Sequence, residues 1–267
     1  MIGTIVFWEL TGGVKREELH KILKAKNQEH WLPNPVSDRK AFMRALKRLE
    51  KDKILVKVKD DPEELVYAIA TANVDEHNKD VDFSLDDVIT LEKATGNVYL
   101  KLQNADPNEI QEAIKYFEDT LTADDIRAMI MRALADCKAI LLRKRGGVYL
   151  VPPDKRDLLM VLKDVVSEIG SELYTLDLVQ NTNTMKDTKK LVYDEIFEEI
   201  ERELKAIEIM AFKKVRSDTI VKAIKRYKNL MTKAKAYEHI LKDKLAEVEE
   251  KITRLEQRAK NILLSNL

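Results

Sequence analysis

The chain has 267 residues, 45% of them hydrophobic, which allows a substantial buried core in one or two domains. Its 47 basic and 47 acidic residues give a net charge of zero, so an argument for a nucleic-acid or membrane partner must rest on local charge segregation. The charged fraction of 35% suggests extended solvated helices or a thermophilic origin. Cys137 is the only cysteine, which excludes a disulfide framework and cysteine-rich metal sites and favours a reducing compartment.

The first ten residues, Met1–Leu10, are apolar and run directly into Thr11 and two glycines. They lack a basic leader and are too short for a signal peptide with its cleavage site, so we interpret them as a strand. No stretch of the chain approaches the roughly 18 consecutive apolar residues that a transmembrane helix needs. We therefore expect a cytoplasmic protein with no membrane contact.

The first part of the chain has the element order of a winged-helix unit. A helix is predicted over 14–26, and a second begins at Ser37 or Asp38, since both are favoured N-cap residues. From residue 53 the apolar period changes to two, which predicts a hairpin of strands at 54–58 and 65–70. Two helices followed by a hairpin are common, so the order is weakly diagnostic.

Two similar segments follow in the middle of the chain. The motif Gly-x-Val-Tyr-Leu begins at Gly96 in one and at Gly146 in the other, and the glycines suit the positive φ of tight hairpins. Either duplication of a ββα unit or convergence on a good turn sequence explains the likeness. The elements expected here are hairpins at 89–102 and 139–152, helices at 108–119, 122–138 and 154–169, and a last strand at 173–179.

The last third of the chain carries an apolar stripe that steps by three and four residues from Ile220 to Ile262. A 3.5-residue repeat sustained over about six heptads is typical of a coiled-coil seam. One helix of this span is roughly 65 to 70 Å long, about twice the helix before it, so a hairpin covers only part of the stripe. The remainder needs the body of the protein, a second copy or another protein. The side chains predicted for oligomerisation are Ile220, Ile224, Tyr227, Met231, Leu241, Leu245, Val248, Ile252, Leu255 and Ile262.

Together these patterns predict an α+β protein. It has a mixed body of antiparallel hairpins, in winged-helix-like or repeated ββα units, followed by a long C-terminal coiled-coil helical hairpin. We place a boundary at the polar run 181–184, the clearest loop in the chain, and expect domains at 1–80, 81–180 and 185–267. Glu238, the charged position of the stripe, either sets its register or marks where it leaves its partner.

The sequence carries no motif of a common catalytic site. Its seven glycines form neither nucleotide-binding loop, and no serine lies in G-x-S-x-G. The four histidines are too far apart for a compact metal motif, and Cys137 is expected to be a small buried hydrophobe. We therefore predict a protein that is not an enzyme and uses no cofactor or metal.

One acidic cluster is a candidate for a divalent cation, because such ions prefer several oxygen ligands. It lacks the spacing of an EF-hand loop, and a solvated acidic turn is the alternative. Its members are Asp75, Glu76, Asp80, Asp82, Asp86 and Asp87.

Charge is strongly segregated along the chain. Residues 39–59 hold nine basic and two acidic side chains, net +7, whereas residues 60–92 hold one basic and eleven acidic side chains, net −10. This alternation suggests that one surface docks on another, within the molecule or between copies. Residues 213–235, with nine basic and one acidic side chain, form a second basic patch, and the hairpin tip at 143–147 forms a third.

Several basic side chains on one surface are what phosphate contacts require, since their binding releases counterions. A solvated or intramolecularly paired surface is the alternative. If nucleic acid binds, we expect these residues to position phosphates and not to read bases. The residues predicted for this role are Arg39, Lys40, Arg44, Lys47, Arg48, Arg143, Lys144 and Arg145.

Two motifs carry a resemblance to a known family. The first, RKAFMRAL at 39–46, follows a Trp-Leu-Pro-x-Pro run, and the second, LRKRGGVYLVP, spans 142–152. Together they resemble an uncharacterised family of proteins carried by phages, plasmids and other prokaryotic mobile elements, with a likeness in outline over residues 1–210. That family offers no mechanism. The resemblance implies a viral or mobile-element genome, which favours DNA-handling, virion or host-interaction roles over metabolism.

The leading hypothesis is a non-enzymatic binding or assembly protein of a phage or mobile element. It oligomerises through its C-terminal coiled coil and contacts DNA or RNA through basic surfaces. An alternative is a structural or adaptor protein that docks a different protein through the heptad helix. A metal-dependent nuclease that uses the acidic cluster is a weaker alternative. The expected location is the cytoplasm, in a host cell or a virion if the protein is viral.

Overall fold

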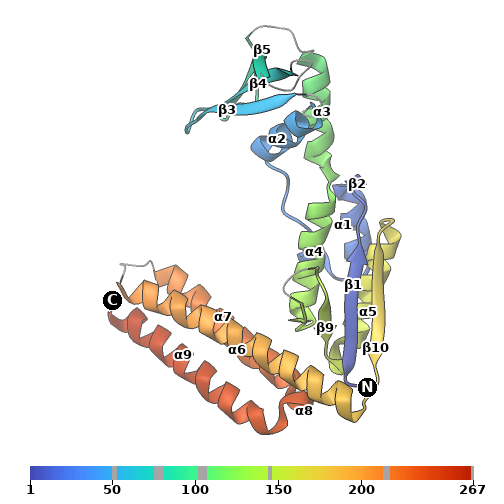
Figure 1. Ribbon diagram of the computed structural model, residues 1–267, viewed down its shortest axis with the longest axis vertical. Coiled ribbons are helices and arrows are strands. Elements are labelled where there is room, and N and C mark those ends of the chain that lie inside the picture. Colours follow the sequence, from blue (N-terminus) through green and yellow to red (C-terminus); the bar gives the residue numbers. More distant parts are fainter. Residues whose placement is uncertain (50–52, 75–80, 102–106, 144–145, 213–216, 266–267) are drawn as a thin grey trace. The chain divides into compact units, whose positions relative to one another are not determined.

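The computed structural model of the protein describes residues 1–49, 53–74, 81–101, 107–143, 146–212 and 217–265 (Figure 1). The chain divides into two compact units. Unit 1 comprises Met1–Thr11 and Arg127–Leu267, and unit 2 comprises Gly12–Ile126. This division differs from the three consecutive domains predicted at 1–80, 81–180 and 185–267, because the first strand pairs with a strand some 170 residues later.

Unit 1 contains a four-stranded antiparallel sheet. Its order is β10 (Glu172–Leu178), β1 (Gly3–Glu9), β9 (Tyr149–Val151) and β8 (Ile140–Leu141). The pairing of β1 with β10 runs from Gly3 opposite Leu178 to Glu9 opposite Glu172. The strands that the sequence predicts at 1–10 and 173–179 are therefore both present. The helices beside this sheet are α4 (Ala123–Asp136), which begins in unit 2, the short η2 (Pro153–Lys155) and α5 (Arg156–Glu168).

The C-terminal stripe does not follow one continuous helix. It is divided among α7 (Ser217–Ala236), α8 (Glu238–Leu241), the turn η3 (Lys242–Lys244) and α9 (Leu245–Ser265), after the preceding α6 (Thr182–Phe212). The helix is interrupted at Lys242, whose φ of 45° and ψ of −108° lie outside the helical region. Glu238 is exposed next to this reversal. Helix α9 then packs beside α7 and α6, as Figure 1 shows.

The folded-back helices bury the stripe within the chain itself. Tyr227 and Leu255 are fully buried, and they share one core with α6 and with Leu150 of the sheet. Tyr237 fixes the reversal, because its buried Oη donates a 2.6 Å hydrogen bond to the carbonyl oxygen of Leu150. Of the ten residues predicted for oligomerisation, Ile220 is buried and the other nine lie in or against this core. The argument that the stripe is too long for the chain to cover is therefore wrong, since it assumed a straight helix.

The polar run 181–184 is the start of a helix and not an interdomain loop. The Oδ1 atom of Asn181 accepts a 2.8 Å hydrogen bond from the backbone N–H of Thr184, so Asn181 caps α6. Asparagine is favoured at this position because its side chain satisfies an N–H group that lacks a partner in the first helical turn.

Unit 2 is built on a second antiparallel sheet, with strands β3 (Ile54–Asp60), β4 (Glu64–Val74), β5 (Val81–Glu92) and β6 (Val98–Leu100) in that order. Helices α2 (Asp38–Leu49) and α3 (Pro107–Asp119) lie against one face of it (Figure 1), where Phe42, Ile69 and Ile110 share a buried cluster. The remaining elements are α1 (Arg16–Ala25), the turn η1 (Glu29–Trp31) and a small sheet of β2 (Val14–Lys15) with β7 (Thr120–Leu121).

The helix-helix-hairpin order of unit 2 continues into β5 and β6, so the predicted hairpin is part of a four-stranded antiparallel sheet. The described residues do not show a separate winged-helix unit. Strand β5 contains acidic residues that suggested a solvated turn. They are compatible with a strand because polar and apolar side chains alternate there. A β-bulge shifts the register where Ile69 faces Asp87 and Ala70 faces Leu85, so the alternation moves to the opposite face after Asp86.

Both segments that contain Gly-x-Val-Tyr-Leu form an antiparallel hairpin followed by a helix. Strands β5 and β6 precede α3, and strands β8 and β9 precede α5. The positive φ expected for the glycines is confirmed, with values of 75° at Gly96 and 102° at Gly146. Duplication of the unit stays a prediction.

We expect Lys242→Gly to raise the free energy of unfolding by about 1 kcal/mol, because glycine adopts this backbone conformation without the steric cost of a β-carbon. Lys228→Gly makes the same change in the exposed interior of α7 and is expected to lower it by about 1 kcal/mol. Chemical denaturation followed by circular dichroism measures both values. Equal destabilisation by the two substitutions would show that the chain does not reverse at Lys242.

Candidate nucleic-acid interface

Helix α2 carries five of the residues predicted for nucleic-acid binding, and its amphipathic pattern determines where they lie. Ala41, Phe42, Ala45 and Leu46 are 0% exposed, because they recur at the three- and four-residue spacing of one helix face. The basic side chains therefore occupy the other faces. Arg44 is partly buried, and the exposed members are Arg39, Lys40, Lys47 and Arg48.

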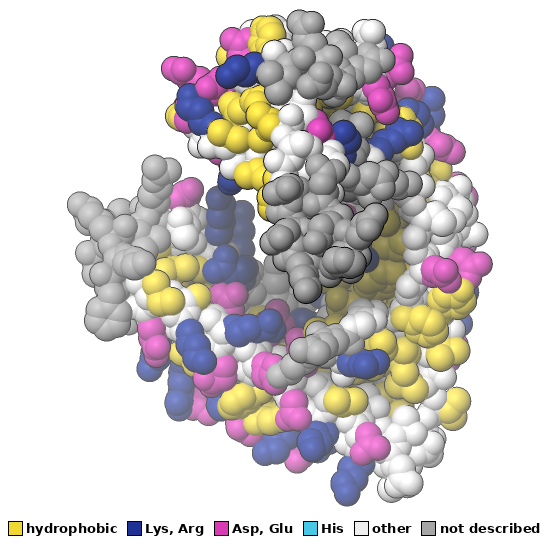
Figure 2. Space-filling model, turned by 45° about the horizontal axis from the view of Figure 1, so that its top comes forward, with side chains coloured by type: hydrophobic (Ala, Val, Ile, Leu, Met, Phe, Trp, Pro, Cys, Tyr) yellow, Lys and Arg dark blue, Asp and Glu magenta, His cyan; other side chains and the backbone are white. Residues whose placement is uncertain are grey.

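The basic segment 39–59 and the acidic segment 60–92 form ion pairs with each other within unit 2. Nη2 of Arg39 lies 2.7 Å from Oδ2 of Asp60, and Nζ of Lys53 lies 2.8 Å from Oδ2 of Asp86. On the face drawn in Figure 2, lysine and arginine side chains are likewise interspersed with aspartate and glutamate. Some of the basic residues of segment 39–59 are thus neutralised by acidic residues of the same chain, and Arg39 is one of them.

The other four basic residues of α2 come together in one groove of about 510 Å³. Lys40, Arg44, Lys47 and Arg48 line it from α2, and Met43 and Phe117 add apolar surface. Thr122 and Asp124, next to the start of α4, complete its lining. The groove thus combines several cations with an apolar surface on a rigid pair of helices.

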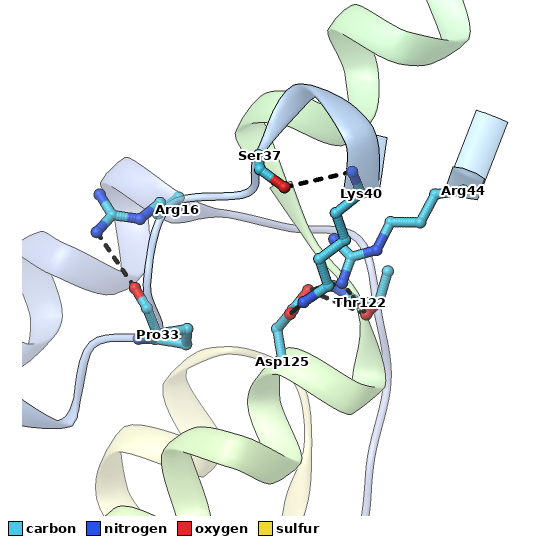
Figure 3. A network of polar contacts seen from close by, with 7 residues as sticks. All are labelled: Arg16, Pro33, Ser37, Lys40, Arg44, Thr122 and Asp125. Atoms are coloured by element: carbon cyan, nitrogen blue, oxygen red, sulfur yellow. Dashed lines mark hydrogen bonds and ion pairs between the residues drawn. The ribbon is translucent and has the colours of Figure 1, made fainter. Parts of the chain in front are cut away.

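A buried carboxylate anchors two of these cations, as Figure 3 shows. Asp125 is 5% exposed, and its Oδ1 accepts a 2.8 Å hydrogen bond from Nζ of Lys40. Its Oδ2 accepts from Nη2 of Arg44 at 2.5 Å and from the backbone N–H of Thr122 at 2.9 Å. Arg44 Nη2 also donates to Oγ1 of Thr122 at 3.1 Å. Asp125 therefore joins the basic face of α2 to the first turn of α4.

The protonation of Asp125 follows from two opposing effects. Burial raises the pKa of its carboxyl, because a buried site disfavours the charged form. The hydrogen bonds from Lys40, from the Thr122 N–H and from Arg44 outweigh burial and bring the pKa down to about 2. Asp125 is therefore ionised at neutral pH and holds the Arg44 guanidinium, whose side chain is 13% exposed.

Lys47 and Arg48 differ from their neighbours because their charges are not matched. Both are exposed, and neither forms an ion pair with another described residue. The Arg48 guanidinium lies 6.0 Å from the ring centre of Tyr116, at the outer limit of a cation–π contact. Nη1 of Arg44 also has no hydrogen-bond partner among the described residues, but this atom is buried and does not reach the surface of the groove. The groove thus offers donors and positive charge to an anionic ligand.

The predicted hairpin-tip site lies in unit 1, and only part of it is described. Arg143 is exposed in the turn between β8 and β9. Lys144 and Arg145 lie outside the described residues. The structure therefore neither joins this site to the α2 groove nor separates it from the groove.

The basic stretch 213–235 is partly neutralised by α6. Nε of Arg226 lies 3.2 Å from a carboxylate oxygen of Glu203, and Nζ of Lys233 lies 2.7 Å from Oε2 of Glu199. Residues 213–216 lie outside the described part of the chain. These pairs make the described basic residues of α7 a weaker candidate than the α2 groove.

The acidic cluster proposed for a metal has a structural role where it is described. Asp86 accepts hydrogen bonds from Lys53 and from Oγ1 of Thr71, and these bonds hold the pKa of its carboxyl below the ordinary value. The described residues contain no group of three His, Cys, Asp or Glu side chains that could hold a metal ion. Residues outside the description, or described only in their backbone, are Asp75, Glu76, Asp80 and Asp82.

Cys137 has the buried role that the sequence predicts. It is 0% exposed, and burial raises the pKa of its thiol to about 12. At neutral pH the thiol therefore stays protonated and is a poor nucleophile.

The sequence reasoning missed Thr122 and Asp125 as parts of the site. Their spacing, a threonine followed three residues later by an acid, is the pattern of a helix N-terminus, and it was used only to place α4. Lys40 and Asp125 are 85 positions apart, so no local pattern indicates their contact.

Comparison with known proteins identifies a family whose function is unknown. The profile described as "Family of unknown function (DUF6744)" matches residues 1–266. No curated protein and no solved structure matches the chain. In the described residues, no helix has both the length and the apolar composition needed to span a membrane.

Asp125→Asn is expected to lower the free energy of unfolding by about 3 kcal/mol at neutral pH, because the buried Arg44 guanidinium loses its counter-charge. Asp124→Asn makes the same change at the exposed neighbouring position and is expected to cost less than about 1 kcal/mol. Chemical denaturation measures both.

The effect of Asp125→Asn also depends on pH with a defined sign. Since the pKa of Asp125 in the folded state, about 2, is below the ordinary value of 3.8, the wild type keeps this stabilisation above about pH 4. It loses the stabilisation as the pH falls through about 2. A deficit of the variant that is the same at neutral pH and at pH 2 would contradict the ion pairs of Asp125.

Proposed function

The chain belongs to DUF6744, a family of unknown function, and we propose that this member is a non-enzymatic protein that binds the phosphate backbone of DNA or RNA through the α2 groove. The observation that carries the proposal is the position of Lys47 and Arg48. They are exposed cations without a described carboxylate partner, and they line the same groove as the anchored Arg44. Exposed, unmatched cations gain most from a phosphate, because no internal ion pair has to be broken first.

Each basic residue of the groove has its own part in this proposal. Lys47 and Arg48 contact phosphates directly, and Lys40, whose side chain is 53% exposed, adds positive charge while bound to Asp125. Arg44 gives the groove a rigid positive centre, because Asp125 holds it. Arg39 pairs with Asp60 and is left out of the proposed interface. Contacts of this kind position the backbone and carry little sequence information.

A phage or mobile-element context is part of the same proposal. The resemblance of residues 39–46 and 142–152 to proteins of such elements supports it, and DNA handling is a frequent task there. A reduced cytoplasm, in the host cell, suits the single buried Cys137.

The two rival functions have less support among the described residues. An adaptor that docks another protein through the heptad stripe rests on side chains that are packed in the chain's own core. A metal-dependent nuclease rests on acidic residues of which Asp86 is bound to Lys53 and Thr71. Both stay predictions.

Fluorescence anisotropy with labelled single- and double-stranded oligonucleotides tests the proposal. We expect Lys47→Gln with Arg48→Gln to weaken binding equally for unrelated sequences. The slope of log affinity against log salt should fall by about 2 for duplex DNA, because two phosphate contacts are lost.

A matched control separates this site from a general effect of charge. Lys24→Gln with Lys205→Gln removes the same charge from exposed positions of α1 and α6, and binding is expected to be unchanged. Absence of binding by the wild type at low salt would remove the proposal. Equal losses in the two double variants would show that net charge, and not the α2 groove, governs binding.

A further inference from the structure

The sheet of unit 2 presents one apolar face to solvent. Helices α2 and α3 lie against its other face (Figure 1). The pairing register places the side chains of Ile54, Ala70 and Leu85 in one row on the open face, with Ala72 and Phe83 adjacent in the next. The large apolar side chains on this face are unusually exposed: Ile54 38%, Val56 50%, Phe83 65%, Leu85 54% and Tyr99 54%.

The bulge at Asp86 produces this face. Beyond it, Ile89 and Leu91 point into the core beneath α2 and α3, where they are at most 1% exposed. Before it, the alternation is reversed, so Phe83 and Leu85 point outward. The exposure of these two side chains is therefore a property of the backbone register.

The relief of the face is a trough between two ridges. The central strand β4 contributes only alanines to the rows Ile54–Ala70–Leu85 and Val56–Ala68–Val88. Larger side chains of β3 and β5 stand on either side. Because neighbouring strands lie about 4.8 Å apart, the trough is about 10 Å wide.

These rows contain no charged residue. On the same face, Lys59 lies in the next row opposite Val66 and pairs with Glu64, which faces Glu92 at the end of the β4–β5 ladder. Covering the middle of the face therefore buries apolar surface without the cost of burying a charge. Contiguous exposed apolar surface of this kind is typical of an interaction site.

We propose that a second copy of this chain covers this face in a twofold-symmetric dimer. A ridge and a trough lie side by side on one surface, so a twofold rotation places the β5 ridge of each copy over the alanine trough of the other. Phe83 and Leu85 then fill the space above Ala68 and Ala70. Two sheets packed in this way lie about 10 Å apart, the spacing at which their side chains interdigitate.

The size of the face limits the area that this dimer can bury. Four strands about 4.8 Å apart and about seven residues of 3.3 Å give roughly 450 Å² per copy. Two copies bury at most roughly 900 Å², because the edge strand β6 spans only Val98–Leu100, and this area is typical of weak, transient interfaces. We therefore expect a weak, reversible dimer. It uses a different surface from the C-terminal stripe and does not depend on nucleic-acid binding.

Sedimentation velocity of the full chain without nucleic acid, from about 1 to 300 µM, tests the proposal through the mass-action dependence of the dimer. The wild type is expected to change from monomer to dimer over this range. Phe83→Thr with Leu85→Thr removes the ridge but keeps a β-forming residue, and it should raise the dimer dissociation constant at least about tenfold. Ala70→Lys puts a charge into the trough and should have the same effect.

Leu176→Thr is the matched control, because Leu176 is 57% exposed on β10 of unit 1. It should leave the dissociation constant unchanged, and circular dichroism checks that every variant is folded. A wild type that is monomeric at all concentrations would overturn the proposal, because another occupant would then cover the face. Self-association that is unchanged by Phe83→Thr with Leu85→Thr, or by Ala70→Lys, would overturn it as well.

Discussion

The ionised carboxylate of Asp125 is the constraint on which the candidate site depends. It is buried, so its charge has to be matched by several donors, and those donors come from the basic face of α2 and from Thr122, the residue before α4. Arg44 is thereby held in one position in the groove that Lys47 and Arg48 also line. A guanidinium that is already oriented loses little entropy when it meets an anion, which favours binding over a flexible basic surface of equal charge.

The basic residues of segment 39–59 have two different roles, which the sequence alone does not separate. Lys53 and Arg39 stabilise the fold of unit 2 through Asp86 and Asp60. Lys47 and Arg48, in the middle of the same basic segment, have no such partner in the described part of the chain. Although the net charge of the chain is zero, Lys47 and Arg48 form a small positively charged surface. Its position becomes evident only when the ion pairs within the chain are known.

Local patterns were sufficient for most individual elements. The apolar start predicted β1, the spacing of Phe42 and Leu46 predicted the buried face of α2, and the glycines predicted the hairpin turns. The errors arose where tertiary contacts prevail over periodicity. The heptad stripe has no gap in this region, yet the chain reverses at Lys242, next to the hydrogen bond from Tyr237 to Leu150. Asp86 is one of several acidic residues in its segment, yet the β-bulge at this position determines which side chains of β5 face solvent. For the candidate site, the sequence indicated the basic residues of α2, but not Asp125, because their contact joins positions far apart in the chain.

The pairing of β1 with β10 also bears on how the chain folds during its synthesis. All of unit 2 has left the ribosome's active centre by residue 126, whereas β1 gains its first neighbour, β9, only after residue 151 is added and its second, β10, only after residue 178. At about 5 to 20 residues per second, roughly 10 to 30 seconds pass before both neighbours of the first strand have been synthesised. During this interval Ile2 and Val6, both buried in the finished protein, are open to water and to other nascent chains. The first strand therefore stays exposed for most of the synthesis of the chain, when a chaperone would protect it.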